Sequence, residues 1–95
     1  MVRVSVSFVV PPPQKKAFKT HFQSAFLPAI SSQRGFMECL LLSPDDTPES
    51  CLRLDITFAS SEEQRAWVAD PLHDQVFGPL SDLAETVEVE RLTVS

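Results

Sequence analysis

The chain has 95 residues, a net charge of −5 and 43% hydrophobic residues, among them seven phenylalanines. This length predicts a single domain over residues 1–95, and the shortage of basic residues excludes the usual electrostatic surface for nucleic acid or an anionic membrane. The apolar content is more than a small monomer hides easily, so we expect a homodimer.

The expected location is the cytoplasm. No apolar run approaches the roughly 18 residues that span a bilayer, and residues 2–10 lack the apolar core and cleavage site of a signal peptide. Cys39 and Cys51 fall in neighbouring predicted strands, where a disulfide would require facing Cβ atoms. Two reduced, packed thiols are the expectation for a reducing compartment.

The first half of the chain predicts a strand, a helix and a second strand. Residues 2–10 alternate apolar and polar side chains, which is typical of a half-buried strand. Three prolines then lead into a helix from about Pro13 to Leu27, and Pro28 should kink or stop it. After a turn at 31–35, residues 36–43 are almost wholly apolar, which is typical of a strand covered on both faces.

The second half predicts the return of that strand, a broken helix and a last strand. A polar loop at 44–50 closes a hairpin with an alternating strand from Leu52 to Phe58. Ser60 then begins a helix with capping-box spacing, and Asp70-Pro71 begins a second helical segment. The pair at 78–79, Gly-Pro, should disturb that segment before a strand over 86–94.

This β-α-β-β-α-β order predicts an α+β fold of the ferredoxin-like type, with a four-stranded antiparallel sheet and both helices on one face. The other face would carry the polar side chains of the strands: Ser5, Ser7, Arg53, Asp55, Glu88 and Glu90. These side chains either face water or form buried ion pairs across a dimer. The apolar excess favours the dimer.

His73 lies in the first turn of a predicted helix. The unpaired N–H groups and positive dipole end of a helix start disfavour the imidazolium ion, so we expect a neutral ring that can accept a proton. One interpretation is a pocket base that orients an aromatic hydroxyl group. The other is a partly exposed residue that caps the helix or pairs with Asp70 or Asp74.

Other candidate residues each have a structural alternative. Trp67, the only tryptophan, forms either a stacking wall for a planar ligand or part of the core. His21 borders the apolar face of the first helix and is either a boundary residue or a pocket residue. No third ligand joins the two histidines at a metal-binding spacing, so no metal is expected. Cys39 lacks a neighbouring base and is expected to be a packed thiol.

Nearly the whole chain resembles the antibiotic biosynthesis monooxygenase (ABM) family of the dimeric α/β-barrel superfamily. The resemblance is carried by the passage from Val6 to Pro13, by Arg34-Gly35-Phe36, and by Ser60 to Glu63 leading to the segment Trp67 to His73. It implies a homodimer whose two sheets form a barrel, with a ligand pocket between sheet and helices in each subunit. His73 is then the candidate catalytic residue, and the candidate substrate-binding residues are Trp67, His21, Phe22 and Phe77.

The haem-degrading members of this superfamily use an Asn on the first strand, a Trp, and a His about ten residues after that Trp. Trp67 fits this pattern, but position 77 is Phe and the chain contains no Asn. The resemblance therefore implies a cofactor-independent monooxygenase that acts on an aromatic or quinone-like small molecule. The alternative is a non-catalytic homodimeric module that binds a small hydrophobic ligand or merely assembles. An enclosed cavity with the His73 ring pointing into it would favour the enzyme, and a helix–sheet interface packed solid by Phe18, Phe22 and Trp67 would contradict it.

Overall fold

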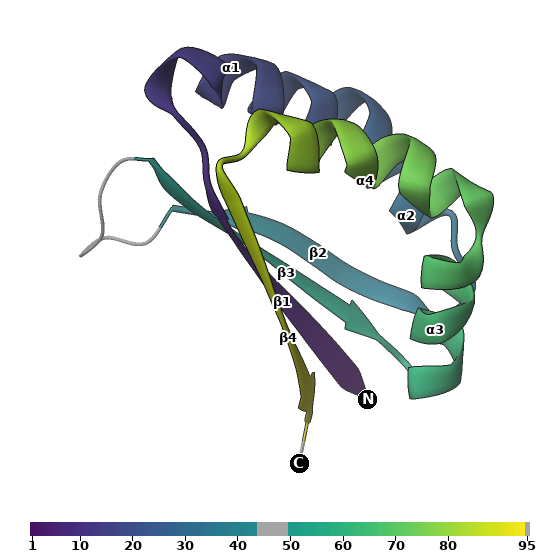
Figure 1. The fold of residues 1–95 in the computed structure, drawn as a ribbon. Coiled ribbons are helices and arrows are strands. Elements are labelled where there is room, and N and C mark those ends of the chain that lie inside the picture. Colours follow the sequence, from purple (N-terminus) through teal and green to yellow (C-terminus); the bar gives the residue numbers. More distant parts are fainter. Residues whose placement is uncertain (44–49, 95) are drawn as a thin grey trace.

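The computed structural model describes residues 1–43 and 50–94. Four strands, β1 (Val2–Val9), β2 (Phe36–Leu42), β3 (Cys51–Phe58) and β4 (Thr86–Thr93), form one antiparallel sheet in the order β2-β3-β1-β4. The helical segments α1 (Pro12–His21), η1 (Phe22–Phe26), α2 (Leu27–Ser31), α3 (Ser61–Ala69) and α4 (Pro71–Leu83) lie on one side of it (Figure 1). The predicted ferredoxin-like fold is confirmed, although most of the predicted loop at 44–50 lies outside the described residues. None of the described helices is long and apolar enough to cross a membrane.

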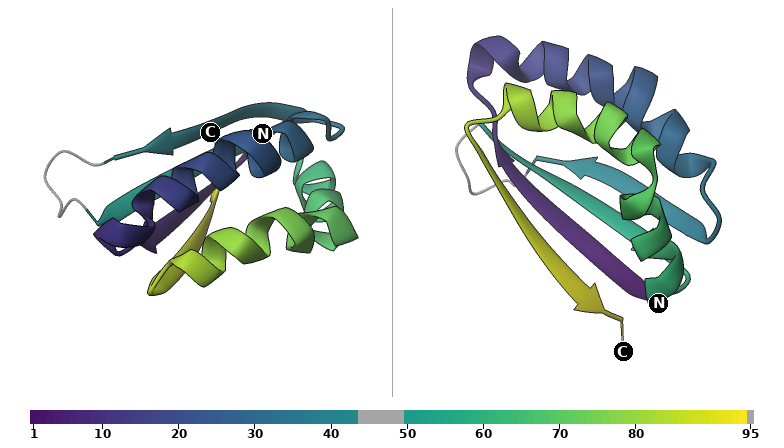
Figure 2. Two further views of the ribbon diagram at one scale, coloured as in Figure 1. Left: turned by 90° about the horizontal axis from the view of Figure 1, so that it is seen from above. Right: turned by 45° about the vertical axis from the view of Figure 1, so that its right-hand side comes forward.

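The core lies between this helical layer and the sheet. Alternate residues of β1 and β3 face the helices and are buried: Val2, Val4, Val6, Phe8, Leu52, Leu54, Ile56 and Phe58. Seen from above, α1 and α4 run side by side across the sheet (Figure 2). Phe18 of α1 packs edge-on against Phe8, with ring centroids 4.9 Å apart. The period-two pattern of the strands thus fixes which face the helices cover.

The first helical region does not end at Pro28. Proline has no N–H to donate to the carbonyl of Ser24, so a regular α-helix would lose one hydrogen bond there. The preceding segment η1 is a π-helix, in which the Leu27 N–H bonds to the Phe22 carbonyl, and α2 then continues to Ser31. The wider π turn accommodates the proline. Of the two predicted alternatives, a kink or a stop, the stop is therefore wrong, and the regular α geometry is instead interrupted just before the proline.

The dipeptide Gly78-Pro79 does not interrupt α4 either, because this helix runs from Pro71 to Leu83. A proline disfavours helical backbone in the residue before it, partly through a clash with the Cβ atom of that residue. Gly78 has no Cβ atom and has open space around its Cα. The helix consequently passes through this pair, contrary to the prediction.

Strand β2 is covered on one face only. Cys39 and Leu41 pack against the core, whereas Met37, Leu40 and Leu42 are exposed. The prediction of a strand covered on both faces is wrong for the single chain, because β2 is an edge strand and the helices lie on one side of the sheet.

The two cysteines do not face each other. Cys39 lies opposite Ile56 and Cys51 opposite Val9, and both thiols are free. Burial raises the pKa of the Cys39 thiol to about 12. A thiol with so high a pKa is a poor nucleophile, which fits the expected packing role.

The sheet face away from the helices carries a charged network. Asp55 accepts hydrogen bonds from Ser5 Oγ at 2.9 Å and Arg53 Nε at 2.8 Å. Arg3 donates to Thr57 Oγ1 at 3.2 Å and pairs with Glu38 at 3.5 Å. Leucines from both edge strands flank the network and are exposed: Leu40, Leu42 and Leu92. This face therefore has a polar centre, and its two edge strands carry both exposed leucines and exposed carboxylates, Glu38 on β2 and Glu88 and Glu90 on β4.

Asp55 should make the stability of the fold depend on pH. Its burial alone would raise the carboxyl pKa, but hydrogen bonds from Arg53 and Ser5 and the charges of Arg53 and Arg3 outweigh that effect, so the pKa is lowered. A lowered pKa stabilises the fold above the unfolded-state value of about 3.9, and this stabilisation is lost as the pH falls through the lower folded-state value. We expect Asp55→Asn to reduce the free energy of unfolding by about 1 kcal/mol near neutral pH. In urea denaturation the difference from wild type should shrink below about pH 4, and a difference independent of pH would contradict this assignment.

Candidate active site

Two N-terminal caps fix where α3 and α4 begin, and α4 carries the candidate catalytic residue His73. Ser60 Oγ accepts a hydrogen bond from the Glu63 N–H at 3.1 Å and so begins α3. At the other end of α3 the backbone of Asp70 is extended, as expected for a residue before proline. The Asp70 carboxylate then accepts a hydrogen bond from the Leu72 N–H at 2.9 Å and begins α4. Both predicted helix starts are confirmed.

This change of direction places His73 against two aromatic rings. The centroids of His73 and Trp67 lie 5.3 Å apart, with the rings nearly perpendicular at 79°. Phe77, four residues further along α4, stacks on the imidazole at 5.2 Å and 13°. The i, i+4 spacing on a helix brings such pairs onto one face. The two aromatic contacts and the first turn of α4 thus fix the imidazole.

The hydrogen bonding of His73 leaves one ring nitrogen available. Nδ1 lies 3.1 Å from Oδ1 of Asp74, and an ionised carboxylate only accepts hydrogen bonds, so Nδ1 is the donor. In the neutral ring Nε2 is then the acceptor, and it has no hydrogen-bond partner among the described residues. The pairing with Asp74 that the sequence suggests is present, and it leaves Nε2 able to take up a proton.

A cavity of about 180 Å³ lies between the sheet and the helices at this point. Its walls come from β1, η1, β3, α3, α4 and β4: Val4, Val6, Phe26, Ile56, Phe58, Gln64, Trp67, Val68, His73, Phe77 and Val89. Val89 belongs to the edge strand β4 and is 62% exposed, so it forms an outer margin of the cavity. The lining contains no Asp, Glu, Lys or Arg, and His73 is its one titratable side chain.

Three of the predicted site residues meet at this cavity, namely His73, Trp67 and Phe77. His21 and Phe22 are not part of its lining. The His21 Nε2–H donates to the Val76 carbonyl at 2.8 Å, which ties α1 to α4. Phe22 is buried and stacks on Phe26, which does line the cavity, with centroids 5.9 Å apart.

Gln64 is a site residue that the sequence interpretation did not identify. It lies three residues before Trp67 on α3, and both side chains are buried and line the cavity. Its exposure is 7%, yet its side-chain amide has no hydrogen-bond partner in residues 1–43 and 50–94. The helical spacing between Gln64 and the only tryptophan is the signal that could have revealed it.

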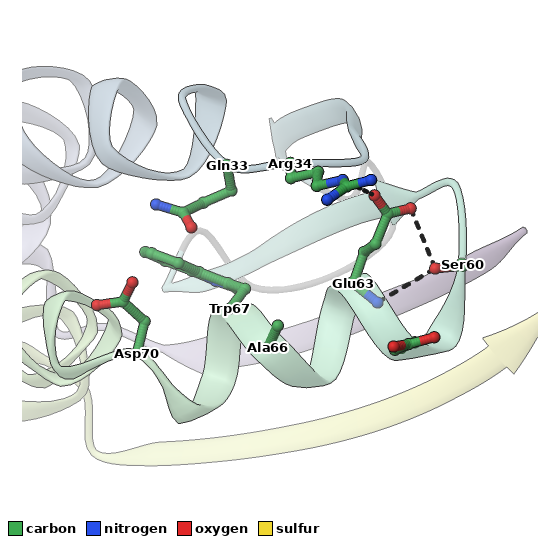
Figure 3. Close-up of a pocket in the computed structure, with 8 residues that line it drawn as sticks. Gln33, Arg34, Ser60, Glu63, Ala66, Trp67 and Asp70 are labelled. Atoms are coloured by element: carbon green, nitrogen blue, oxygen red, sulfur yellow. Dashed lines mark hydrogen bonds and ion pairs between the residues drawn. The ribbon is translucent and has the colours of Figure 1, made fainter.

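The opposite side of Trp67 borders a larger but different hollow of about 560 Å³ (Figure 3). There the indole lies between Gln33 and Asp70, and the guanidinium of Arg34 pairs with Glu63 at 3.7 Å. The Arg34 side chain is 96% exposed, so this pair is solvated and contributes little. Its polar, charged walls make this hollow a surface groove rather than an apolar pocket.

The described residues bring no group of three His, Cys, Asp or Glu side chains together in a geometry that could hold a metal ion. His21 and His73, the two histidines weighed as a metal pair, have separate partners in Val76 and Asp74.

No protein-family model and no curated protein matches the sequence. Solved structures match the fold over nearly its full length. SnoaB, a cofactor-independent oxygenase from Streptomyces nogalater, has a TM-score of 0.82 at 21% identity, over 99% of this chain and 92% of SnoaB. A candidate antibiotic biosynthesis monooxygenase from Deinococcus radiodurans has a TM-score of 0.86 at 11% identity, over 100% and 93% of the two chains. A conserved protein from Methanosarcina mazei Go1 has a TM-score of 0.84 at 15% identity, over 96% of this chain and 89% of that protein's chain. The chain therefore has the ferredoxin-like fold of the antibiotic biosynthesis monooxygenases, as its sequence resemblance to that family predicts.

Proposed function

We propose that this protein is a cofactor-independent monooxygenase that acts on a small aromatic or quinone-like molecule in the cavity between helices and sheet. The observation that carries the proposal is the position of His73: its Nδ1 bonds to Asp74, and the residue lines an apolar cavity together with Trp67 and Phe77. The fold shared with SnoaB, a cofactor-independent oxygenase, supports the same reaction class.

In the proposed reaction His73 acts as a general base. Its Nε2 accepts the proton of a substrate hydroxyl group, and the resulting electron-rich ring reacts with O2. A hydroquinone that becomes a hydroxyquinone supplies four electrons: one oxygen atom enters the product and the other leaves as water. The substrate itself is then the reductant, so the balance needs no bound cofactor.

The aromatic walls would hold the substrate ring. Trp67 and Phe77 contact the imidazole and line the same cavity, so a planar ligand stacked on either of them lies beside the base. Phe22 supports the wall from behind Phe26, and His21 keeps α1 in place against α4. Holding the base and the substrate ring in a fixed relative orientation lowers the activation barrier of the reaction.

The sheet face away from the helices is the proposed dimer interface, and a barrel is the proposed assembly. Its exposed leucines Leu40 and Leu42 lie opposite Asp55 and Arg53 in the register of β2 and β3, and Leu92 lies on β4 opposite Arg3 of β1. Burial of these leucines beside a paired charge network is consistent with an interface between two copies. The proposed location is the cytoplasm, where the free thiols of Cys39 and Cys51 persist.

Oxygen uptake with a panel of hydroquinones and anthrones tests the reaction. We expect His73→Phe, which keeps an aromatic ring between α3 and α4 but removes the base, to lower kcat by about 100-fold or more. His73→Ala should lower it at least as much. Thermal unfolding of each variant checks that the fold is retained.

Asp82→Asn is the matched control, because Asp82 is exposed on the same helix and does not line the cavity. Its rate should equal that of wild type. Equal rates in wild type and His73→Phe would remove His73 from the mechanism. If no compound in the panel stimulates oxygen uptake by the wild type, the monooxygenase proposal fails and the binding module becomes the better account.

Sedimentation tests the dimer separately. At micromolar concentration we expect a species of twice the 10.6 kDa chain mass. Leu40→Glu, which replaces a leucine of the proposed interface with a charged residue, should shift the equilibrium to the monomer. A wild-type species of 10.6 kDa would count against the dimeric barrel.

A further inference from the structure

We infer that Gln64 recognises a hydroxyl or carbonyl group on a neutral ligand that has one aromatic ring. The inference rests on the proposed function for the location of the site, and it adds the size, the charge and the polar contact of the substrate.

The size follows from the cavity volume. An apolar cavity of roughly 150 Å³ holds one benzene molecule. The cavity beside His73 measures about 180 Å³, which leaves room for one ring with one or two small substituents. Three fused rings exceed this volume, so such a ligand would extend past the exposed margin at Val89.

The neutral charge follows from the composition of the walls. Apart from Gln64 and His73, every lining residue is apolar, and no Asp, Glu, Lys or Arg lines the cavity. Burying a charged ligand without a partner of opposite sign is strongly unfavourable. An ammonium group on the ligand would have no acidic partner in these walls, and a carboxylate would have one only in His73 after that ring had taken up a proton.

The polar contact follows from the state of the Gln64 amide. Buried side-chain amides are nearly always hydrogen-bonded in folded proteins, because an unpaired one loses its hydration without compensation. Gln64 is 7% exposed and has no side-chain partner in the described part of the chain. Every inaccessible polar side-chain atom of the described residues has a hydrogen-bond partner, so the unpaired Gln64 amide is accessible, and Gln64 is one of the residues that line the cavity. An amide both donates and accepts, and so fits either a hydroxyl or a carbonyl group.

Phenol and benzene are the probes, since they differ by one hydroxyl group. Binding is followed through the fluorescence of Trp67, the only tryptophan, which lines the cavity. We expect the ratio of the benzene Kd to the phenol Kd to fall about tenfold in Gln64→Leu relative to wild type, because leucine keeps the volume and removes the amide. Gln75→Leu is the matched control, because Gln75 is exposed on α4, and its ratio should be that of wild type.

An unchanged ratio in Gln64→Leu overturns the inference, as does the absence of saturable phenol binding to the wild type. For size, hydroquinone should bind at least tenfold more tightly than anthrone, and tighter binding of anthrone overturns the one-ring assignment. The proposed function is tested apart from this. Phenol binding that depends on Gln64 without oxygen uptake supports the inference and contradicts the enzyme. Oxidation of hydroquinone by Gln64→Leu with wild-type kcat and KM overturns the inference and supports the enzyme.

Discussion

At Asp70 the chain leaves one helix and enters the next through a single extended residue, and the candidate site depends on that geometry. Pro71 forces the preceding backbone out of the helical region, while the Asp70 carboxylate satisfies the first free N–H of α4. In one continuous helix, a separation of six residues would turn the side chains of Trp67 and His73 to different faces of the helix. With the break at Asp70, the two rings are 5.3 Å apart.

The cavity is bordered on one side by the edge strand β4. Val89 faces the same side of the sheet as the core valine Val6, its partner in β1, yet 62% of Val89 remains exposed. The core is otherwise closely packed by phenylalanines, with Phe8, Phe18 and Phe26 fully buried. Apolar walls with a few polar groups are the composition of a small-molecule site, and the volume of about 180 Å³ is smaller than is usual for one. The larger hollow beside Arg34 and Glu63 has the opposite character.

Much of the fold was predictable, because it depends on local patterns. The alternation in residues 2–10 and 52–58 and the caps at Ser60 and Asp70 gave the strands and the helix starts. The errors concern effects that composition does not reveal. A π turn just before Pro28 lets the helix continue through that proline, and Pro79 is tolerated because a glycine precedes it. Exposure of β2 depends on its place at the sheet edge, which is a property of the topology.

The site was predictable where contacts are local and not where they join distant elements. His73 and Phe77 are one turn apart, so their pairing could be read from the spacing. The separation of His21 from the cavity depends on how α1 packs on α4, and the burial of Gln64 depends on the sheet beneath α3. Neither packing is encoded in a short motif.

A crystal structure with hydroquinone bound tests directly whether the apolar cavity beside His73 is the substrate site. We expect the ring in the cavity against Trp67 and Phe77, with its oxygens about 2.6–3.2 Å from His73 Nε2 and the Gln64 amide. Hydroquinone bound instead in the polar hollow lined by Arg34 and Asp70, with the apolar cavity empty, would contradict it.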